Sequence, residues 1–138
     1  MIRTLLYNTA SGILARGGEE LLRRWQQEPD TVIWTDFSGH QPQQEKQILE
    51  ETFGIHQLAI QDAQRERHPP KLEAYSDYSF LLLKELSPDA GEFDFATSQL
   101  ALFIGERFLI TRRIGASPGT DKLFQQTTGN AALFADGQ

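Results

Sequence analysis

The stretch Thr31-Val32-Ile33-Trp34-Thr35-Asp36-Phe37, followed directly by Ser38-Gly39-His40-Gln41-Pro42, decides the fold class of this chain. The first seven residues are mostly β-branched or aromatic, which is typical of a half-buried strand. The next four form a turn, and Pro42 suits the first position of a helix because its missing N–H would have no partner there. A strand that leads through a short turn into a helix indicates an α/β protein.

The segments on either side continue this alternation. Residues 2–8 are expected to form a short strand and residues 19–27 a helix with acidic residues in its first turn. The helix that begins at Pro42 is expected to run to Phe53 and to end at Gly54, a residue that readily takes the left-handed C-terminal conformation. A second short helix should follow, with one face formed by Ile55, Leu58, Ala59, Asp62 and Ala63.

The second half of the chain predicts the rest of the sheet. Residues 78–86 read as a strand whose continuous apolar centre suggests burial on both faces. Residues 99–104 and 107–111 read as a hairpin joined by a two-residue Gly105-Glu106 turn of the Gly-X type. A helix over 120–126 completes the pattern. The expected fold is therefore an α/β domain in which helices are layered on a mixed parallel and antiparallel sheet.

Composition limits the function. The 138 residues are expected to form a single domain, and the net charge of −6 argues against an electrostatic nucleic-acid interface. The chain has no cysteine, which excludes disulfides, thiolate metal sites and a cysteine nucleophile. Its N-terminus lacks a secretory signal, and its longest stretch without charged residues is far shorter than the ~20 apolar residues of a membrane span.

Enzyme signatures are weak. The chain has no Gly-x-Ser-x-Gly motif, residues 115–122 lack the Gly-Lys-Ser/Thr ending of a phosphate loop, and its three histidines do not have zinc-ligand spacing. Asp36 and Asp62 lie beside apolar residues and could bond to backbone amides or cap turns. A small α/β hydrolase or phosphate-binding protein that uses these two aspartates and an acidic loop is kept as an alternative.

That acidic loop is the most suggestive set of residues for metal binding. Four carboxylates surround the turn 87–91, namely Glu85, Asp89, Glu92 and Asp94. Clustered carboxylates repel one another, and a hard divalent cation relieves this repulsion. Magnesium is usually held by one or two carboxylates and several waters, so one loop could supply part of a site.

Five short motifs, in order between Trp34 and Arg112, carry a family resemblance. They are Trp34-Thr35-Asp36-Phe37, Phe53-Gly54-Ile55-His56-Gln57-Leu58-Ala59-Ile60-Gln61-Asp62, Pro70-Lys71-Leu72-Glu73, the Phe-containing strand 78–83, and the paired strands 99–111. Together they resemble the N-terminal cytoplasmic domain of the CorA family of divalent-cation transporters. Gln57 and Pro69 depart from the family pattern, which usually has proline and arginine at these positions.

The resemblance implies a function for this region. It implies a non-enzymatic, ion-sensing domain of a magnesium or cobalt transporter, at the cytoplasmic face of the inner membrane, in a homopentamer. Residues 1–138 would precede the stalk and the membrane helices, with 114–138 leading toward the stalk. In the family, Mg²⁺ bound between neighbouring cytoplasmic domains favours the closed state, and counting from Lys84 places Asp89 at the position of one ligand.

The resemblance leaves the ion open. The ending Ile110-Thr111-Arg112-Arg113 would also suit the zinc-transporting ZntB-like branch, so Zn²⁺ is the alternative to Mg²⁺ or Co²⁺. In the family, contact with the membrane comes through helices that this sequence does not contain. Without them, the chain is expected to be a monomer or weak dimer in solution.

Overall fold

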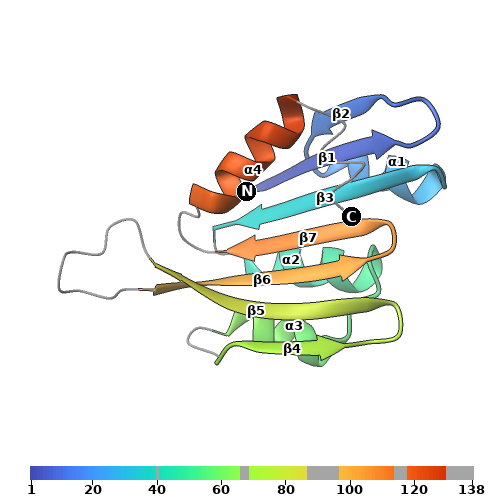
Figure 1. The fold of residues 1–138 in the computed structure, drawn as a ribbon. Helices are drawn as coiled ribbons and strands as arrows, with labels where there is room; N and C mark the ends of the chain where they lie inside the picture. The colour runs from blue at the N-terminus through green and yellow to red at the C-terminus, as the bar shows by residue number, and fades with distance from the viewer. Residues whose placement is uncertain (40, 66–68, 87–96, 114–117, 130–138) are drawn as a thin grey trace.

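Seven strands form one sheet in the order β2-β1-β3-β7-β6-β5-β4 (Figure 1). The computed structural model describes residues 1–39, 41–65, 69–86, 97–113 and 118–129. The strands are β1 (Ile2–Asn8), β2 (Leu14–Gly17), β3 (Thr31–Ser38), β4 (Lys71–Ala74), β5 (Tyr78–Leu86), β6 (Thr97–Gly105) and β7 (Phe108–Arg113). Among these strands, β3 and β7 are the one parallel pair and all other neighbours are antiparallel. The predicted mixed α/β fold is confirmed.

Four helices cover the sheet on two sides. They are α1 (Glu20–Gln27), α2 (Pro42–Glu51), α3 (Gln57–Gln64) and α4 (Pro118–Gly129). Helices α1, α2 and α3 lie on one face and α4 lies on the other (Figure 1). The longest described helix, α4, has 12 residues. Within the described part of the chain, no helix is both long and apolar enough to cross a membrane.

The main core lies between the sheet and the three-helix layer. Trp25 of α1 packs against Phe53 and Phe108, with ring centroids 5.0 and 6.1 Å away. Phe80 and Phe103 stack at 4.8 Å on neighbouring strands β5 and β6. Burial of such large aromatic side chains contributes strongly to folding.

The helices form where they are predicted, except that α2 ends at Glu51 and not at Phe53 and that α3 buries a different set of residues. Pro42 begins α2, and Gly54 follows it with φ of +67°, a left-handed conformation that glycine adopts without strain. In α3, however, Leu58 is 60% exposed and Ile60 is buried. The sequence pattern places Leu58 on the apolar face, but in the structure Ala59, Ile60 and Ala63 form the buried face of α3.

The hairpin prediction was wrong in its register. Ile104 pairs with Leu109, and β6 ends at Gly105 while β7 begins at Phe108, so the two connecting residues are Glu106 and Arg107 and not Gly105 and Glu106. Gly105 does not have the positive φ that the predicted turn requires. Glycine is needed there for another reason, since a Cβ atom on Gly105 would collide with the Phe108 ring.

The burial prediction for β5 was also wrong. Phe80 and Leu82 are buried under the three-helix layer, whereas Leu83, on the opposite face, is 40% exposed. Two short strands, β2 and β4, were not predicted at all. Each has only four residues and lies at an edge of the sheet, where sequence patterning is weakest.

Candidate functional site

The acidic segment predicted to bind metal connects β5 to β6. The strands are paired along their whole length, and the last pair joins Leu86 to Thr97. The segment between them therefore leaves and re-enters the sheet at one point. Asp89, Glu92 and Asp94 fall within residues 87–96, which are outside the described residues. Among the residues that are described, no three His, Asp or Glu side chains are grouped as metal ligands.

Asp36 is the centre of an ionic network on the α4 side of the sheet. Its side chain is fully buried and accepts hydrogen bonds from Arg3 Nε at 2.7 Å and from Thr111 Oγ1 at 2.6 Å. Arg113 Nη2 lies 3.4 Å from the same carboxylate. The Trp34 indole N–H donates to Thr111 Oγ1 at 3.0 Å. Asp36 thus joins side chains of β1, β3 and β7, which are distant in sequence.

Asp121 extends this network to α4. Its Oδ1 atom accepts hydrogen bonds from Arg3 Nη2 and Arg113 Nη2, each at 2.6 Å. Phe124, one turn further along α4, packs edge-on against Trp34 with 4.9 Å between centroids and lies 4.3 Å from the Arg3 guanidinium carbon. The network therefore fastens α4 to the sheet.

Asp62 belongs to a second network on the opposite side of the sheet. Lys71 Nζ of β4 donates to Asp62 Oδ2 of α3 at 2.5 Å and also pairs with Glu73. Hydrogen bonds to Asp62 and Glu73 raise the pKa of Lys71, and the bond from Lys71 lowers the pKa of Glu73. This network holds the edge strand β4 against α3, which explains why Lys71 and Glu73 occur in one motif.

Tyr75 closes this second network. Its hydroxyl donates to Glu73 Oε2 at 3.0 Å, and its ring stacks on Tyr78 at 4.7 Å. Burial, together with the hydrogen bond to Glu73, raises the pKa of Tyr75 to about 12. The arrangement keeps the hydroxyl protonated, as a donor to a carboxylate that is itself held ionised.

The structure does not bring Asp36 and Asp62 together. Asp36 faces α4, whereas Asp62 is on α3 on the other side of the sheet (Figure 1). Both aspartates bond to side chains, Asp36 to Arg3 and Thr111 and Asp62 to Lys71, which the expectation of backbone bonding or turn capping did not include. The alternative of an enzyme that uses them as paired carboxylates fails on this geometry, because acid–base catalysis requires both groups at one reacting atom.

Sequence reasoning missed a third buried network at the end of α3. Arg112 Nε lies 2.8 Å from Glu45 Oε2, and Arg112 Nη1 donates to the Ala63 carbonyl at 2.8 Å. Gln99 Nε2 donates to the Ala63 and Arg65 carbonyls. These donors satisfy carbonyls that the last turn of a helix leaves without partners. Two consecutive arginines at the end of an apolar strand could have indicated it, because consecutive side chains point to opposite faces.

His56 has a structural role. Its Nδ1 atom accepts a hydrogen bond from the Leu58 amide at 3.1 Å, which caps the N-terminus of α3. Its backbone amide donates to the Tyr78 hydroxyl at 2.8 Å. His40 and His68 lie outside the described residues. The hydrogen bonds of His56 thus fix the start of α3.

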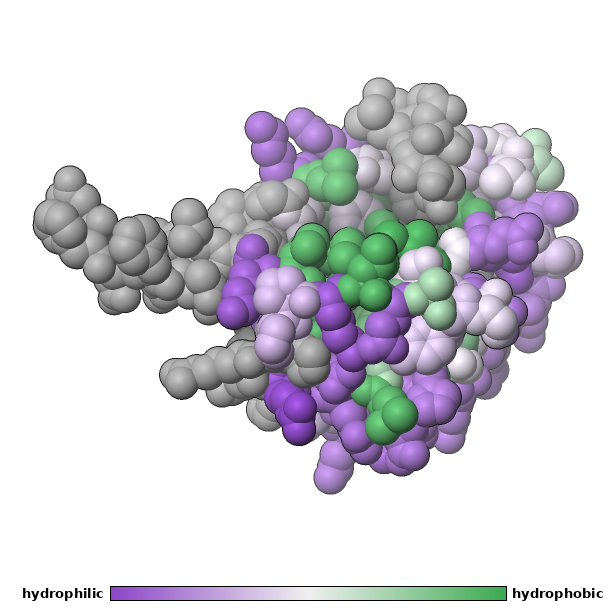
Figure 2. Space-filling view, turned by 60° about the horizontal axis from the view of Figure 1, so that its bottom comes forward, coloured by the Kyte–Doolittle hydropathy of each residue, from purple (hydrophilic) through white to green (hydrophobic). Residues whose placement is uncertain are grey.

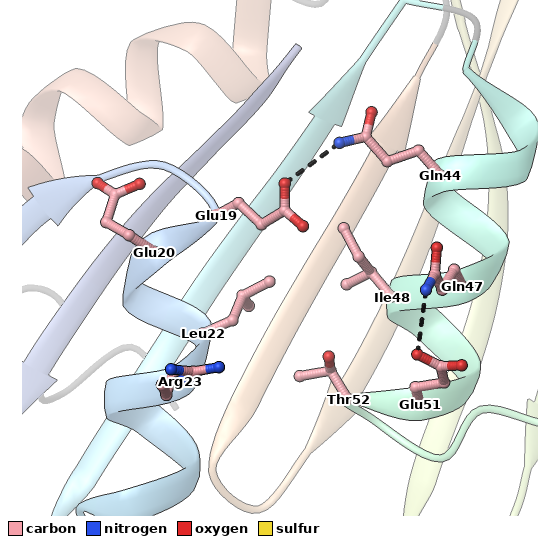
Figure 3. Close-up of a pocket in the computed structure, with 9 residues that line it drawn as sticks. All are labelled: Glu19, Glu20, Leu22, Arg23, Gln44, Gln47, Ile48, Glu51 and Thr52. Atoms are coloured by element: carbon pink, nitrogen blue, oxygen red, sulfur yellow. Dashed lines mark hydrogen bonds between the residues drawn. The ribbon is translucent and has the colours of Figure 1, made fainter.

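A cleft of about 600 Å³ lies between α1 and α2 (Figure 3). Leu22 and Ile48 are its apolar members, and Glu19 accepts a hydrogen bond from Gln44 across it at 3.2 Å. The lining residues are Glu19, Glu20, Leu22, Arg23, Gln44, Gln47, Ile48, Glu51 and Thr52. None of the residues predicted to carry function lines this cleft.

The α4 side of the sheet also has an exposed apolar area, here named the outer apolar face. It consists of Leu72 of β4, Leu81 and Leu83 of β5, and Leu102 and Ile104 of β6, and Figure 2 shows hydrophobic side chains grouped at the surface on this side. Leu72 pairs with Leu81, and Leu81 with Leu102, in one row across three strands. Leu72 is 70% exposed and Ile104 is 42% exposed. Large exposed apolar areas of this kind mark interaction surfaces.

Comparison with known proteins gives the family. The sequence model described as "CorA-like Mg2+ transporter protein" matches residues 29–135. The chain belongs to the CorA family. The matched region includes all five motifs and, apart from Arg3, the residues of the two networks that contain Asp36 and Asp62.

Two curated relatives support this CorA assignment. The chain is 29% identical over 112 residues to "Putative metal ion transporter YfjQ" of Bacillus subtilis, which covers 80% of this chain and 34% of the relative. It is 28% identical over 74 residues to the cobalt/magnesium transport protein CorA of Thermotoga maritima, which covers 54% of this chain and 21% of that protein. The chain thus spans at most about a third of these relatives, which are named as transporters and not as enzymes.

Solved structures share the CorA-type fold. The full-length CmaX protein superposes with a TM-score of 0.69 at 18% identity, over 91% of this chain and 38% of that one. The soluble domain of CorA from Methanocaldococcus jannaschii superposes with a TM-score of 0.61 at 17% identity, over 91% and 46%. The seven-stranded sheet with four helices is therefore the fold of a CorA soluble domain.

Proposed function

We propose that this chain is the ion-sensing, regulatory domain of a CorA-like magnesium or cobalt transporter. The observation that carries the proposal is the family match over 29–135, together with relatives named for metal ion and cobalt/magnesium transport. The domain would act at the cytoplasmic face of the membrane, and the ion pathway would lie in parts of the transporter beyond this chain.

Asp89 is the proposed regulatory ligand. It follows Leu86, the last paired residue of β5, by three positions. In a homopentamer, Asp89 would face a carboxylate of a neighbouring copy. A Mg²⁺ ion between the two offsets their repulsion and so favours the assembly state in which they face each other. The described residues form no competing carboxylate cluster for this role.

The sequence feature that suggested zinc has a structural explanation. In the ending Ile110-Thr111-Arg112-Arg113, Thr111 and Arg113 contact Asp36, and Arg112 pairs with Glu45. These side chains therefore have structural contacts within the domain. Magnesium or cobalt, named in a relative, is the preferred cargo, and uptake of Mg²⁺, Co²⁺ and Zn²⁺ by the full-length transporter in vesicles would decide the ion.

The regulatory role is tested in the full-length transporter with Asp89→Asn, which removes the charge at nearly constant size. We expect the Mg²⁺ concentration that closes the transporter to rise by about tenfold, as for a coupling of 1–3 kcal/mol. Asp77→Asn, in the turn between β4 and β5, is the matched control. If both variants close at the parent's Mg²⁺ concentration, Asp89 is not the ligand.

A further inference from the structure

Among its described side chains, helix α4 buries little apolar surface against the sheet. Its buried described side chains are Thr120, Phe124 and Thr127, and of these only Phe124 is a large hydrophobic residue. Phe124 packs on Trp34, whereas Leu123 is 51% exposed. The apolar part of the attachment therefore depends mainly on one aromatic ring.

The ionic part of the attachment depends on Asp121. Arg3 of β1 and Arg113 of β7 both donate to Asp121 Oδ1, and both also contact Asp36. We name these two guanidinium groups the arginine clasp. Because the buried Asp36 belongs to β3, the sheet itself positions the clasp, and α4 contributes the carboxylate that enters it and the Phe124 ring that lies over Arg3.

The exposed fractions of the side chains show which contact of the Asp36–Asp121 network is most accessible to water. The Asp36 side chain is 0% exposed, Arg113 7% and Arg3 19%, whereas Asp121 is 41% exposed. Water and dissolved ions can therefore compete for Asp121 much better than for Asp36. The network is weakest between α4 and the clasp, and strongest within the sheet.

Helix α4 covers apolar surface that adjoins the outer apolar face. Phe124 lies over Leu5 and Trp34, and Leu109 packs beside them. Leu109 pairs with Ile104, which belongs to the outer apolar face. If α4 moved away, the exposed apolar area would continue from β4 across the sheet to β1.

We propose that α4 is a lid that is latched to the sheet by charge. The latch is the Asp121 carboxylate in the arginine clasp, and breaking it releases α4 from a sheet that stays folded. Release uncovers Trp34 and extends the outer apolar face. This device is independent of Asp89 and of the ion that the transporter carries.

The test is Asp121→Asn in the 138-residue chain, measured by hydrogen exchange. We expect the amides of α4 to exchange at least about tenfold faster than in the parent, while the amides of β3 keep their rates. Acrylamide should quench the tryptophan fluorescence of Asp121→Asn more strongly than that of the parent. In a Trp34→Phe background, which leaves Trp25 as the remaining tryptophan, Asp121→Asn should not increase the quenching.

Two controls make the result decisive. Asp77→Asn removes an exposed carboxylate elsewhere and should change neither readout. In an Arg3→Met background, Asp121→Asn should have a smaller effect, because part of the clasp is already lost. Unchanged exchange in α4 would overturn the proposal, and so would an equal rise in α4 and β3, which would mean that Asp121 supports the whole domain.

Discussion

Glu45 and Arg112 form an ion pair that is closed off from water. Arg112 Nε lies 2.8 Å from Glu45 Oε2, and the two side chains are 2% and 3% exposed. The pair joins α2 to β7 and, through the Ala63 carbonyl, to the end of α3. It therefore ties three elements together beneath the helical layer.

Breaking this pair should strongly destabilise the domain. Glu45→Ala leaves the Arg112 charge buried without compensation, and we expect a loss of about 3–5 kcal/mol in the free energy of unfolding. Urea denaturation measures the loss. Glu50→Ala, an exposed position on the same helix, should change stability by less than about 0.5 kcal/mol. Similar losses in the two variants would contradict the prediction.

Gly105 should not tolerate a side chain. In Gly105→Ala the new methyl group meets the Phe108 ring, and overpacking of this kind costs about 1–3 kcal/mol. The same substitution in a Phe108→Leu background should cost less, because the obstructing ring is gone. A double-mutant cycle by chemical denaturation tests this, and an additive result would show that the ring is not the cause.

The pair of Lys71 and Glu73 should make stability sensitive to acid. The hydrogen bond from Lys71 lowers the pKa of Glu73 below its usual 4.5, so its contribution is present above pH 4.5 and is lost as pH falls through the lower native pKa. NMR titration of the Glu73 carboxyl should show this low midpoint, and Lys71→Met should move it upward. A midpoint that Lys71→Met leaves in place would refute the assignment.

A lysine introduced at two neighbouring positions of β5 should affect the stability of the domain very differently. Leu83 lies on the outer apolar face and is 40% exposed, so Leu83→Lys should change stability by less than about 0.5 kcal/mol and reduce self-association. Leu82, one position earlier, is buried under the three-helix layer, and Leu82→Lys should unfold the domain. Light scattering and circular dichroism distinguish these outcomes. Equal unfolding by both would show that the outer apolar face is covered.

The layered fold was predictable because its signals are local. The β-branched run 31–37, Pro42 and Gly54 each act through their own backbone preferences, and the structure confirms them. The register of the β6–β7 hairpin was not predictable in this way. It depends on where the Phe108 ring packs against Trp25 and Phe53, which is a tertiary contact.

The site residues were predictable only in part. The motifs pointed to Asp36, Asp62 and Lys71, but not to their partners, because Arg3 and Thr111 lie 33 and 75 positions from Asp36. A local sequence pattern does not reveal contacts between residues so far apart in the sequence. Asp89 remains a prediction, since it rests on the family resemblance and on its place after β5.

The parallel contact between β3 and β7 has a consequence for how the chain folds. Strands β4 to β7 form an antiparallel meander, whereas β1 lies between β2 and β3 and pairs antiparallel with both; within the described sheet, β3 and β7 are where these two groups join. The pairings within each group are closer in sequence, whereas the junction must first close a loop of about 70 residues, which is slow. We therefore expect the two halves to form early and their junction late. The Trp34 indole donates a hydrogen bond to Thr111 across that junction. Its fluorescence should therefore follow the pairing of β3 with β7, the last step of folding.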